Sequence, residues 1–226
     1  MTAFSMQNRV KCDARLGILQ ENGPQRQILE AFIQARYAQI YGADIRHFLP
    51  WLLCLSEQGE LRSVLGLRPG SSGPFFVEKY LDAPLESIIS AEHGCVSRTQ
   101  IIETGNLAAV GGSSPLLFSL LTQLLYQSGF RWVTFTATTQ VKNLLQRLGM
   151  HPQWLCNADV TRLGSEAAHW GSYYDANPCV LLGNLEGAYY TLKDNDLAQK
   201  ALEEYRAELE AMVLLLRPAA QGVVHE

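Results

Sequence analysis

An excess of basic residues is the first thing that the sequence lacks. It has 18 lysines and arginines against 22 aspartates and glutamates, so its net charge at pH 7 is −4. Binding to a nucleic-acid backbone or to an anionic lipid surface depends on clustered positive charge. We therefore expect neither nucleic acid nor an anionic membrane surface as a partner of this chain.

Paired cysteine motifs are missing as well. The five cysteines are scattered and odd in number, and no two of them form a C-x-x-C pair. This distribution is typical of reduced thiols in a cytoplasm, and it favours neither a disulfide framework nor a zinc site. We predict no metal site and no permanently bound cofactor.

Long hydrophobic runs do not occur either. A membrane-spanning helix needs about 18 or more apolar residues in a row, and no segment reaches that length without charges. The first residues, MTAFSMQNRVKCDARLG, contain charges and no apolar run, unlike a secretory signal. We expect a cytoplasmic protein that does not insert stably into membranes.

The 226 residues, 47% of them hydrophobic, are enough for one sizeable core with a small appendage. Hydrophobic periodicity and Gly/Pro punctuation predict alternating strands and helices. Strands are expected near 12–19, 51–55, 61–68, 99–109, 132–138, 151–163 and 178–185. Helices are expected over 23–42, in turns of 75–89 that break at Pro84, over 114–129, 139–149 and 195–216. We predict a domain over residues 1–190 and a helical extension over 191–226, which packs on the domain or in a homodimer.

The segment from Glu103 to Gly149 carries the strongest functional signal. Its strand is followed by Gly111, Gly112, Ser113 and Ser114, then by an apolar helix with Pro115 at its start. Ser114 is predicted as the N-cap, and a glycine such as Gly105 in a strand often marks a bulge. Small residues before a helix N-terminus let backbone N–H groups bind an anion. The motifs G-x-x-x-x-G-K-[ST] and G-x-G-x-x-G are absent, which disfavours nucleotide triphosphates and Rossmann dinucleotides.

A carboxylate on the strand before such a loop fits a ligand with a pyrophosphate group, such as coenzyme A. Glu103 could then remove a proton from an amine nucleophile. The alternative is that Glu103 is a structural carboxylate that pairs with Arg98 or Lys142. We weigh the catalytic and the structural interpretation equally, because a carboxylate in so apolar a strand is costly unless it has an ion-pair partner or a catalytic role. Arg68 at a strand end has a similar alternative as a solvated side chain. The aromatic segment WGSYYDAN is expected to be a lid or pocket wall, or simple surface packing.

The block over 103–149 resembles the core of the GNAT acyltransferase superfamily. That resemblance implies a mixed, mostly antiparallel, twisted sheet with helices on both faces, that is, an α/β (α+β) fold. It also implies that the loop over 111–114 binds the coenzyme A pyrophosphate and that Asn143 lies near the thiol end of the donor. The loop departs from the usual Q/R-x-x-G-x-G/A pattern, since no arginine or glutamine precedes the glycines. This leaves longer acyl-CoA or acyl carrier protein possible as the donor in place of acetyl-CoA.

A narrower resemblance covers residues 10–190. The segments ETGNLAAV, FVEKYLD, WVTFTAT, RLGMHPQWLCNAD and WGSYYDANPCVLLG occur in an order that is similar to the thermostable hemolysin family. That family is assigned a GNAT-like fold. The related acyl-homoserine lactone and N-acyl amino acid synthases, which are more distant, join a fatty acyl group to an amino-acid-like amine. A basic residue paired with a strand acid, here Arg98 with Glu103, is the feature shared with them.

These observations lead us to expect an N-acyltransferase that uses an acyl-CoA or an acyl-phosphopantetheine carrier as co-substrate. Glu103 would be the general base and Asn143 would position the thiol end. The backbone of Leu107, Ala108 and Ala109 would bind the pantetheine or the thioester carbonyl. The predicted contacts to a small amine acceptor are Arg68, Arg98, Asn106 and Thr136, with an arginine holding its carboxylate. The alternatives are a membrane-active cytolysin, as the family name implies, and a non-catalytic acyl-binding module.

Overall fold

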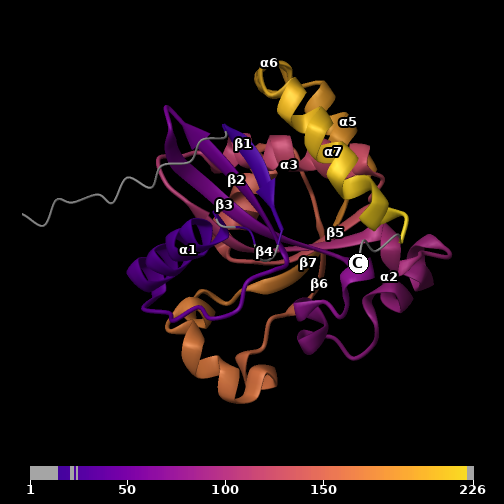
Figure 1. The fold of residues 1–226 in the computed structure, drawn as a ribbon. Coiled ribbons are helices and arrows are strands. Elements are labelled where there is room, and N and C mark those ends of the chain that lie inside the picture. The colour runs from indigo at the N-terminus through magenta and orange to yellow at the C-terminus, as the bar shows by residue number, and fades with distance from the viewer. Residues whose placement is uncertain (1–14, 21–22, 24, 223–226) are drawn as a thin grey trace, which may run out of the picture.

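Seven strands form one open sheet at the centre of the protein (Figure 1). In the computed structural model, which describes residues 15–20, 23 and 25–222, their order is β1-β2-β3-β4-β5-β7-β6. The strands are β1 (Leu16–Leu19), β2 (Trp51–Glu57), β3 (Glu60–Pro69), β4 (Ile101–Ala109), β5 (Trp132–Ala137), β6 (Gln153–Asn157) and β7 (Cys179–Asn184). Only the β4–β5 pair is parallel. The predicted mixed, mostly antiparallel sheet is confirmed.

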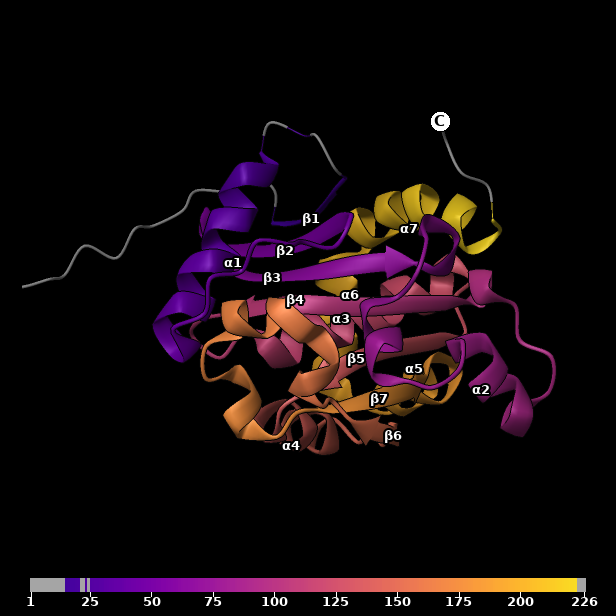
Figure 2. The same cartoon turned by 90° about the horizontal axis from the view of Figure 1, so that it is seen from below.

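Helices cover both faces of the sheet, as predicted (Figure 2). The α-helices are α1 (Arg26–Tyr41), α2 (Leu85–His93), α3 (Ser114–Ser128), α4 (Thr139–Arg147), α5 (Leu185–Lys193), α6 (Asp196–Glu204) and α7 (Arg206–Ala220). Helices α3, α5, α6 and α7 share one core with the sheet, whereas α1 packs on β2 and β3 from the other side. No helix in the described ranges is long and apolar enough to cross a lipid bilayer.

Five short 3-10 helices lie in the connections between the described strands and helices. They are η1 (Gly70–Ser72), η2 (Phe76–Tyr80), η3 (Arg98–Gln100), η4 (Val160–Trp170) and η5 (Tyr173–Ala176). Side chains from η2, α2 and η4 form a second core with Ile101 and Trp132 at the start of β4 and β5. These segments therefore lie over the middle of the sheet, where the two parallel strands meet.

Strands β4 and β5 pair over only a short distance. Their register runs from Ile101 opposite Trp132 to Glu103 opposite Thr134 and ends there. On its other edge β4 pairs with β3, with a register irregularity opposite Val64–Gly66, and Asn106 has a φ of 50°. This left-handed conformation is one that asparagine tolerates better than most residues, and it confirms the bulge predicted near Gly105. Past Glu103, β4 presents backbone groups towards a gap rather than towards β5.

Several element boundaries differ from the sequence predictions. Ser113, not Ser114, is the residue before α3, and its hydroxyl is held by Ser63 of β3 at 2.6 Å. The expected strand over 151–163 ends at Asn157, because the Asp159 carboxylate accepts a hydrogen bond from the Thr161 N–H and starts η4. The helical turns expected over 75–89 continue further, since α2 ends at His93. Residues 12–14 of the first predicted strand lie outside the described residues.

The C-terminal extension is built differently from the single helix predicted over 195–216. It consists of α6 and α7, separated at the buried Tyr205, and α5 precedes them without having been predicted. Leu209, Met212 and Leu216 of α7 are buried in the core that α3 also enters. Helix α7 thus shares a core with α3, and the division into a domain over 1–190 and an extension over 191–226 stays a prediction. The homodimer stays a prediction.

Candidate active site

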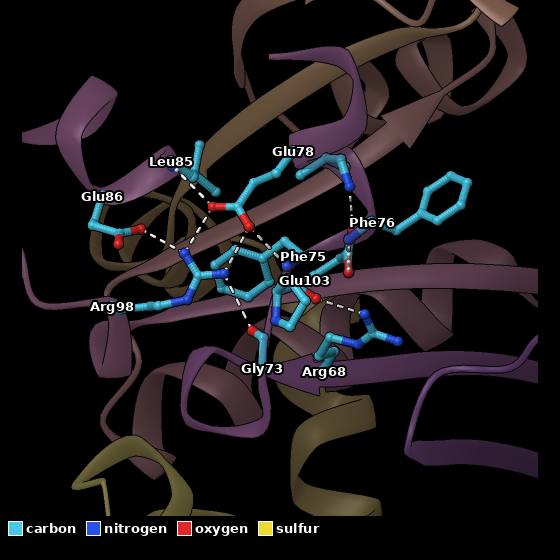
Figure 3. Close-up of polar contacts among 11 residues, drawn as sticks. Arg68, Gly73, Phe75, Phe76, Glu78, Leu85, Glu86, Arg98 and Glu103 are labelled. Carbon is cyan, nitrogen blue, oxygen red and sulfur yellow. Dashed lines mark hydrogen bonds and ion pairs between the residues drawn. The ribbon is translucent and has the colours of Figure 1, made fainter. Parts of the chain in front are cut away.

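Glu103 lies on β4 at the last residue that pairs with β5. Its side chain is only 2% exposed. The two carboxylate oxygens accept hydrogen bonds from the backbone N–H groups of Phe76 (2.8 Å) and Val77 (2.7 Å), as Figure 3 shows for Phe76. The first N–H groups of a helix lack partners within the helix, and here the carboxylate satisfies those of η2. Glu103 is therefore tied to η2 and not to Arg98 or Lys142, the partners that the structural alternative expected.

The chain turn that brings η2 to β4 depends on glycine. A Cβ atom added to Gly70 would lie 2.0 Å from the Arg98 carbonyl oxygen, so no other residue fits there without a backbone shift. Gly73 has a φ of 123°, which side chains rarely allow. The Glu78 carboxylate then accepts hydrogen bonds from the N–H groups of Phe75 and Leu85, which ties the start of η2 to the start of α2. The position of the Glu103 partners is thus set by the loop that follows β3.

Burial raises the pKa of Glu103 from its ordinary value of 4.5 to about 7. Loss of solvation is the largest cause, because a charged carboxylate is costly away from water. The hydrogen bonds from Phe76 and Val77 act in the opposite direction, and so does the positive charge of Arg68. A carboxyl group with a pKa near neutrality can accept and release a proton under physiological conditions, as a general base must.

Arg98 does not take part in this arrangement. Its guanidinium pairs with Glu78 at 2.7 Å and Glu86 at 2.6 Å, and it lies 4.2 Å from the centre of the Phe75 ring. Figure 3 shows it between the two carboxylates, on the other side of the Gly73–Phe76 segment from Arg68. The predicted pairing of Arg98 with Glu103 was wrong. Arg98 connects η3 to η2 and α2, so a contact with an acceptor carboxylate is also not supported.

Arg68 occupies the position beside Glu103 instead. The two residues are register partners on β3 and β4. One terminal nitrogen of Arg68 donates to the Pro74 carbonyl oxygen at 2.6 Å, and no ion pair to a described carboxylate occupies the rest of the guanidinium. Its charge lowers the pKa of Glu103, although burial outweighs that effect. A guanidinium with free donors beside a buried carboxyl group is suited to bind a carboxylate of a ligand.

Both residues line a pocket of about 120 Å³, which we call the Glu103 pocket. Its charged and titratable lining residues are Arg46, His47, Arg68, Glu103, Glu166 and His169. Tyr37, Trp170 and Tyr173 form an aromatic wall, so the segment WGSYYDAN is a pocket wall as one of its two interpretations predicted. Asn106 also lines the pocket, but its side-chain amide is used to bind the backbone of Leu49 and His47. It shapes the pocket wall in addition to any contact with a ligand.

A second opening of about 370 Å³, the β4–β5 cleft, lies where the two strands diverge. Predicted residues that line it are Leu107, Ala108, Ala109, Gly112, Ser114 and Thr136. Gly111 and Ser113 do not line it, and Ser113 is buried with its hydroxyl bonded to Ser63 and to backbone carbonyls. Thr136 also lines the Glu103 pocket and accepts a 3.4 Å hydrogen bond from the Tyr173 hydroxyl. The structure therefore brings most of the predicted loop and strand residues together.

Asn143 is not among them. It is exposed on α4, and the residues of that helix that line the cleft are Gln140, Val141, Leu144 and Arg147. Side chains three and four residues apart share a helix face, so this set defines one face and leaves Asn143 outside it. The role that the GNAT resemblance implies for Asn143 has no support in its position.

A third cavity, of about 270 Å³, lies on the opposite side of the sheet between α3, β5 and α5. Its lining is mainly apolar and includes Phe118, Leu121, Leu125 and Phe135. Thr104 lines both this apolar cavity and the Glu103 pocket. Both spaces therefore border β4 at the residue that follows Glu103, one on each side of the sheet.

Sequence reasoning missed Arg36, Tyr37, Thr104 and Arg147, which line these three spaces. Thr104 follows Glu103 in β4, and the other three lie on α1 and α4, where no motif marks them. Three or more His, Cys, Asp or Glu side chains that could hold a metal ion do not come together anywhere among the described residues.

Comparison with known families identifies one match. The sequence profile described as thermostable hemolysin matches residues 19–189. No curated protein matches the sequence significantly.

Solved structures with a similar fold are more informative about the architecture. The acyl-homoserine lactone synthase LasI has a TM-score of 0.52 and 13% identity, covering 77% of this chain and 93% of its own. BjaI, a CoA-dependent acyl-homoserine lactone synthase with SAM and isopentyl-CoA, has a TM-score of 0.52 and 12% identity, and the match covers 89% of this chain and 99% of BjaI. FeeM, an N-acyl amino acid synthase from uncultured soil microbes, has a TM-score of 0.50 and 12% identity, and the match covers 82% of this chain and 99% of FeeM. At such low identity these similarities establish the fold.

Proposed function

This protein belongs to the thermostable hemolysin family, and from its fold and site geometry we propose that it is an N-acyltransferase. The reaction joins the acyl group of a thioester donor to the amine of an amino-acid-like acceptor. The observation that carries the proposal is Glu103, a buried carboxyl with a pKa raised to about 7. It lines the polar Glu103 pocket, its neighbour Thr104 also borders the apolar cavity, and the β4–β5 cleft shares four lining residues with the pocket.

The Glu103 pocket is suited to the acceptor. Arg68 supplies free guanidinium donors for a carboxylate, and its register position places it directly beside Glu103. An amine near Glu103 can transfer a proton to the carboxylate as its nitrogen bonds to the thioester carbonyl carbon. The carbon–sulfur bond then breaks, and the sulfur leaves as a thiol after it takes up the proton that Glu103 accepted from the amine. Bases of this kind typically contribute about 100- to 10,000-fold to a rate.

The donor fits the other two spaces. Backbone groups of Leu107, Ala108 and Ala109 border the β4–β5 cleft, and β4 has no β5 partner there. Unpaired backbone groups need a hydrogen-bonding partner, which the amides of a pantetheine arm or the thioester carbonyl would supply. The acyl chain would enter the apolar cavity past Thr104. The named activities of LasI, BjaI and FeeM, all of which make N-acyl products, support this assignment.

The test is product formation by purified protein. Acyl-CoA and acyl carrier protein donors of several chain lengths are incubated with pooled amino acids and amines, and new amides are identified by mass spectrometry. We expect Glu103→Gln to reduce the rate by about 100-fold or more without changing affinity for CoA measured by calorimetry. Glu57→Gln, which removes an exposed carboxylate at the end of β2, is the matched control.

The outcomes separate the functions considered. Amide formation that depends on Glu103 supports the N-acyltransferase. Donor binding without product in any pairing would point to an acyl-binding module and refute the proposal. Lysis of red cells by the pure protein with no substrate present, together with an absence of product, would favour a direct cytolysin.

A further inference from the structure

Of the three spaces described above, the β4–β5 cleft has the largest excess of positively charged lining residues. Arg36 of α1 and Arg147 of α4 line it from opposite walls, and no aspartate or glutamate does. The chain as a whole carries a net charge of −4. Two guanidiniums in a cleft without carboxylates therefore create a local field that attracts an anion against the charge of the rest of the molecule.

Neither arginine is neutralised by its surroundings. No ion pair joins Arg36 or Arg147 to a described carboxylate, whereas Arg62 on the adjacent β3 pairs with Glu57 and Glu60. The Nε atom of Arg36 is buried and has no hydrogen-bond partner among the described residues, while one terminal nitrogen donates to Gln39. A buried donor without a partner destabilises the folded protein. An anion bound in the cleft would remove that destabilisation.

The cleft and the Glu103 pocket are adjacent. Leu107, Thr136, Tyr37 and Tyr173 line both. A ligand that reaches Glu103 through the cleft must be long, with its reactive group at one end and its negative charge at the other. The N-terminus of α3, where Gly112 and Ser114 line the cleft, adds backbone N–H groups on the same side.

We propose that Arg36 and Arg147 bind the phosphate groups of coenzyme A, so that the donor is a free CoA thioester rather than an acylated carrier protein. This inference rests on the proposed function. Coenzyme A carries a pyrophosphate and a 3′-phosphate, enough anionic groups for two guanidiniums and a helix N-terminus. A carrier-bound pantetheine offers a single phosphodiester. The basic residue missing before Gly111 is thus replaced by two arginines from helices distant in the sequence.

The experiment measures binding without turnover. Calorimetry with CoA, 3′-dephospho-CoA, 4′-phosphopantetheine and holo-acyl carrier protein is carried out on wild type, Arg36→Gln and Arg147→Gln. Each substitution is expected to weaken CoA binding about tenfold, the size of one charge-assisted hydrogen bond. Binding of 4′-phosphopantetheine is expected to be much weaker and to change less. Lys142→Gln removes one charge from α4 outside the cleft and is the matched control.

Arg147 also lies in the last turn of α4, where a positive charge stabilises the helix on its own. Thermal unfolding of each variant therefore accompanies the binding data. If a glutamine variant does not fold, its lysine counterpart, Arg36→Lys or Arg147→Lys, is measured in its place because it keeps the positive charge. Independently of any variant, the CoA affinity of the wild type must fall steeply between 50 and 500 mM salt.

Three results would overturn the proposal. They are no CoA binding by wild type, CoA affinity unaffected in both glutamine variants, and loss of carrier-protein affinity in place of CoA affinity. The proposed reaction can fail separately. Weakened CoA binding in the arginine variants, with no amide formed from any donor, would refute the acyl transfer and retain the phosphate site.

Discussion

The pH dependence of stability is the sharpest consequence of the buried Glu103. An ordinary glutamate in the unfolded chain has a pKa near 4.5, whereas in the folded protein the pKa is about 7. The folded state therefore holds a proton that the unfolded state has released between these pH values. Stability from this group is fully present below pH 4.5 and is lost as the pH rises through about 7. The difference amounts to roughly 3 kcal/mol.

Glu103→Gln isolates this contribution. Glutamine does not titrate, and its carbonyl oxygen still accepts one of the two hydrogen bonds from Phe76 and Val77. The other backbone N–H then faces an amide nitrogen, which costs about 1–3 kcal/mol at every pH. The variant should therefore be the less stable protein at pH 4.5, and the difference from wild type should shrink or reverse by pH 8.

The measurement is urea unfolding of both proteins at half-unit steps from pH 4.5 to 8 and constant ionic strength. Subtracting the two free-energy curves cancels groups that titrate independently of Glu103. Glu57→Gln serves as an exposed control whose curve should follow wild type. A wild-type minus variant difference that stays constant across this range would refute the argument, since Glu103 would then ionise in the folded protein as it does in the unfolded chain.

Three further substitutions test the surrounding assignments. Arg98→Ala should lower the free energy of unfolding by about 2 kcal/mol, because Glu78 and Glu86 lose their shared partner; an unchanged urea midpoint would contradict that role. Arg68→Gln should raise the KM for a carboxylate-bearing acceptor about tenfold and leave the KM for an acceptor amine without a carboxylate unchanged. Steady-state kinetics with both acceptors measures this, and an equal rise in both KM values would contradict the assignment. Ala188→Phe fills the apolar cavity from α5 and should shift the products formed from mixed donors towards shorter acyl chains. Mass spectrometry of the products measures this shift, and an unchanged chain-length distribution would show that the acyl chain binds elsewhere.

Much of the fold follows from local pattern. The turn at Gln58-Gly59 and the end of α1 at Gly42 use residues with positive φ, so sequence identifies them directly. The break between α6 and α7 is different. No glycine or proline marks it, and the helix stops at Tyr205, whose burial in the main core depends on tertiary packing. Sequence periodicity alone therefore predicted one helix.

The site was predictable in the same uneven way. Glu103 was identifiable because an acid in an apolar strand is unusual, and the loop after it because glycine and serine precede a helix. Its hydrogen-bond donors come from 26 and 27 residues earlier in the chain, and Arg36 reaches the cleft from another helix altogether. Spacing carries no information about such contacts. The same limit explains why Arg98, close to Glu103 in sequence, was paired with the wrong acid.

The family name and the proposed reaction are compatible through the product. An N-acyl amino acid joins an apolar tail to a carboxylate, and such a molecule disrupts bilayers as a detergent does. Lysis of red cells by cells that contain the enzyme would then require Glu103 and both substrates. A protein-free organic extract of the reaction would also lyse red cells, because it contains the product. Lysis that stays with the purified protein and survives Glu103→Gln would instead assign it to the chain itself. Glu103→Gln thus distinguishes lysis caused by the product from lysis caused by the protein, because only the first requires proton transfer to Glu103.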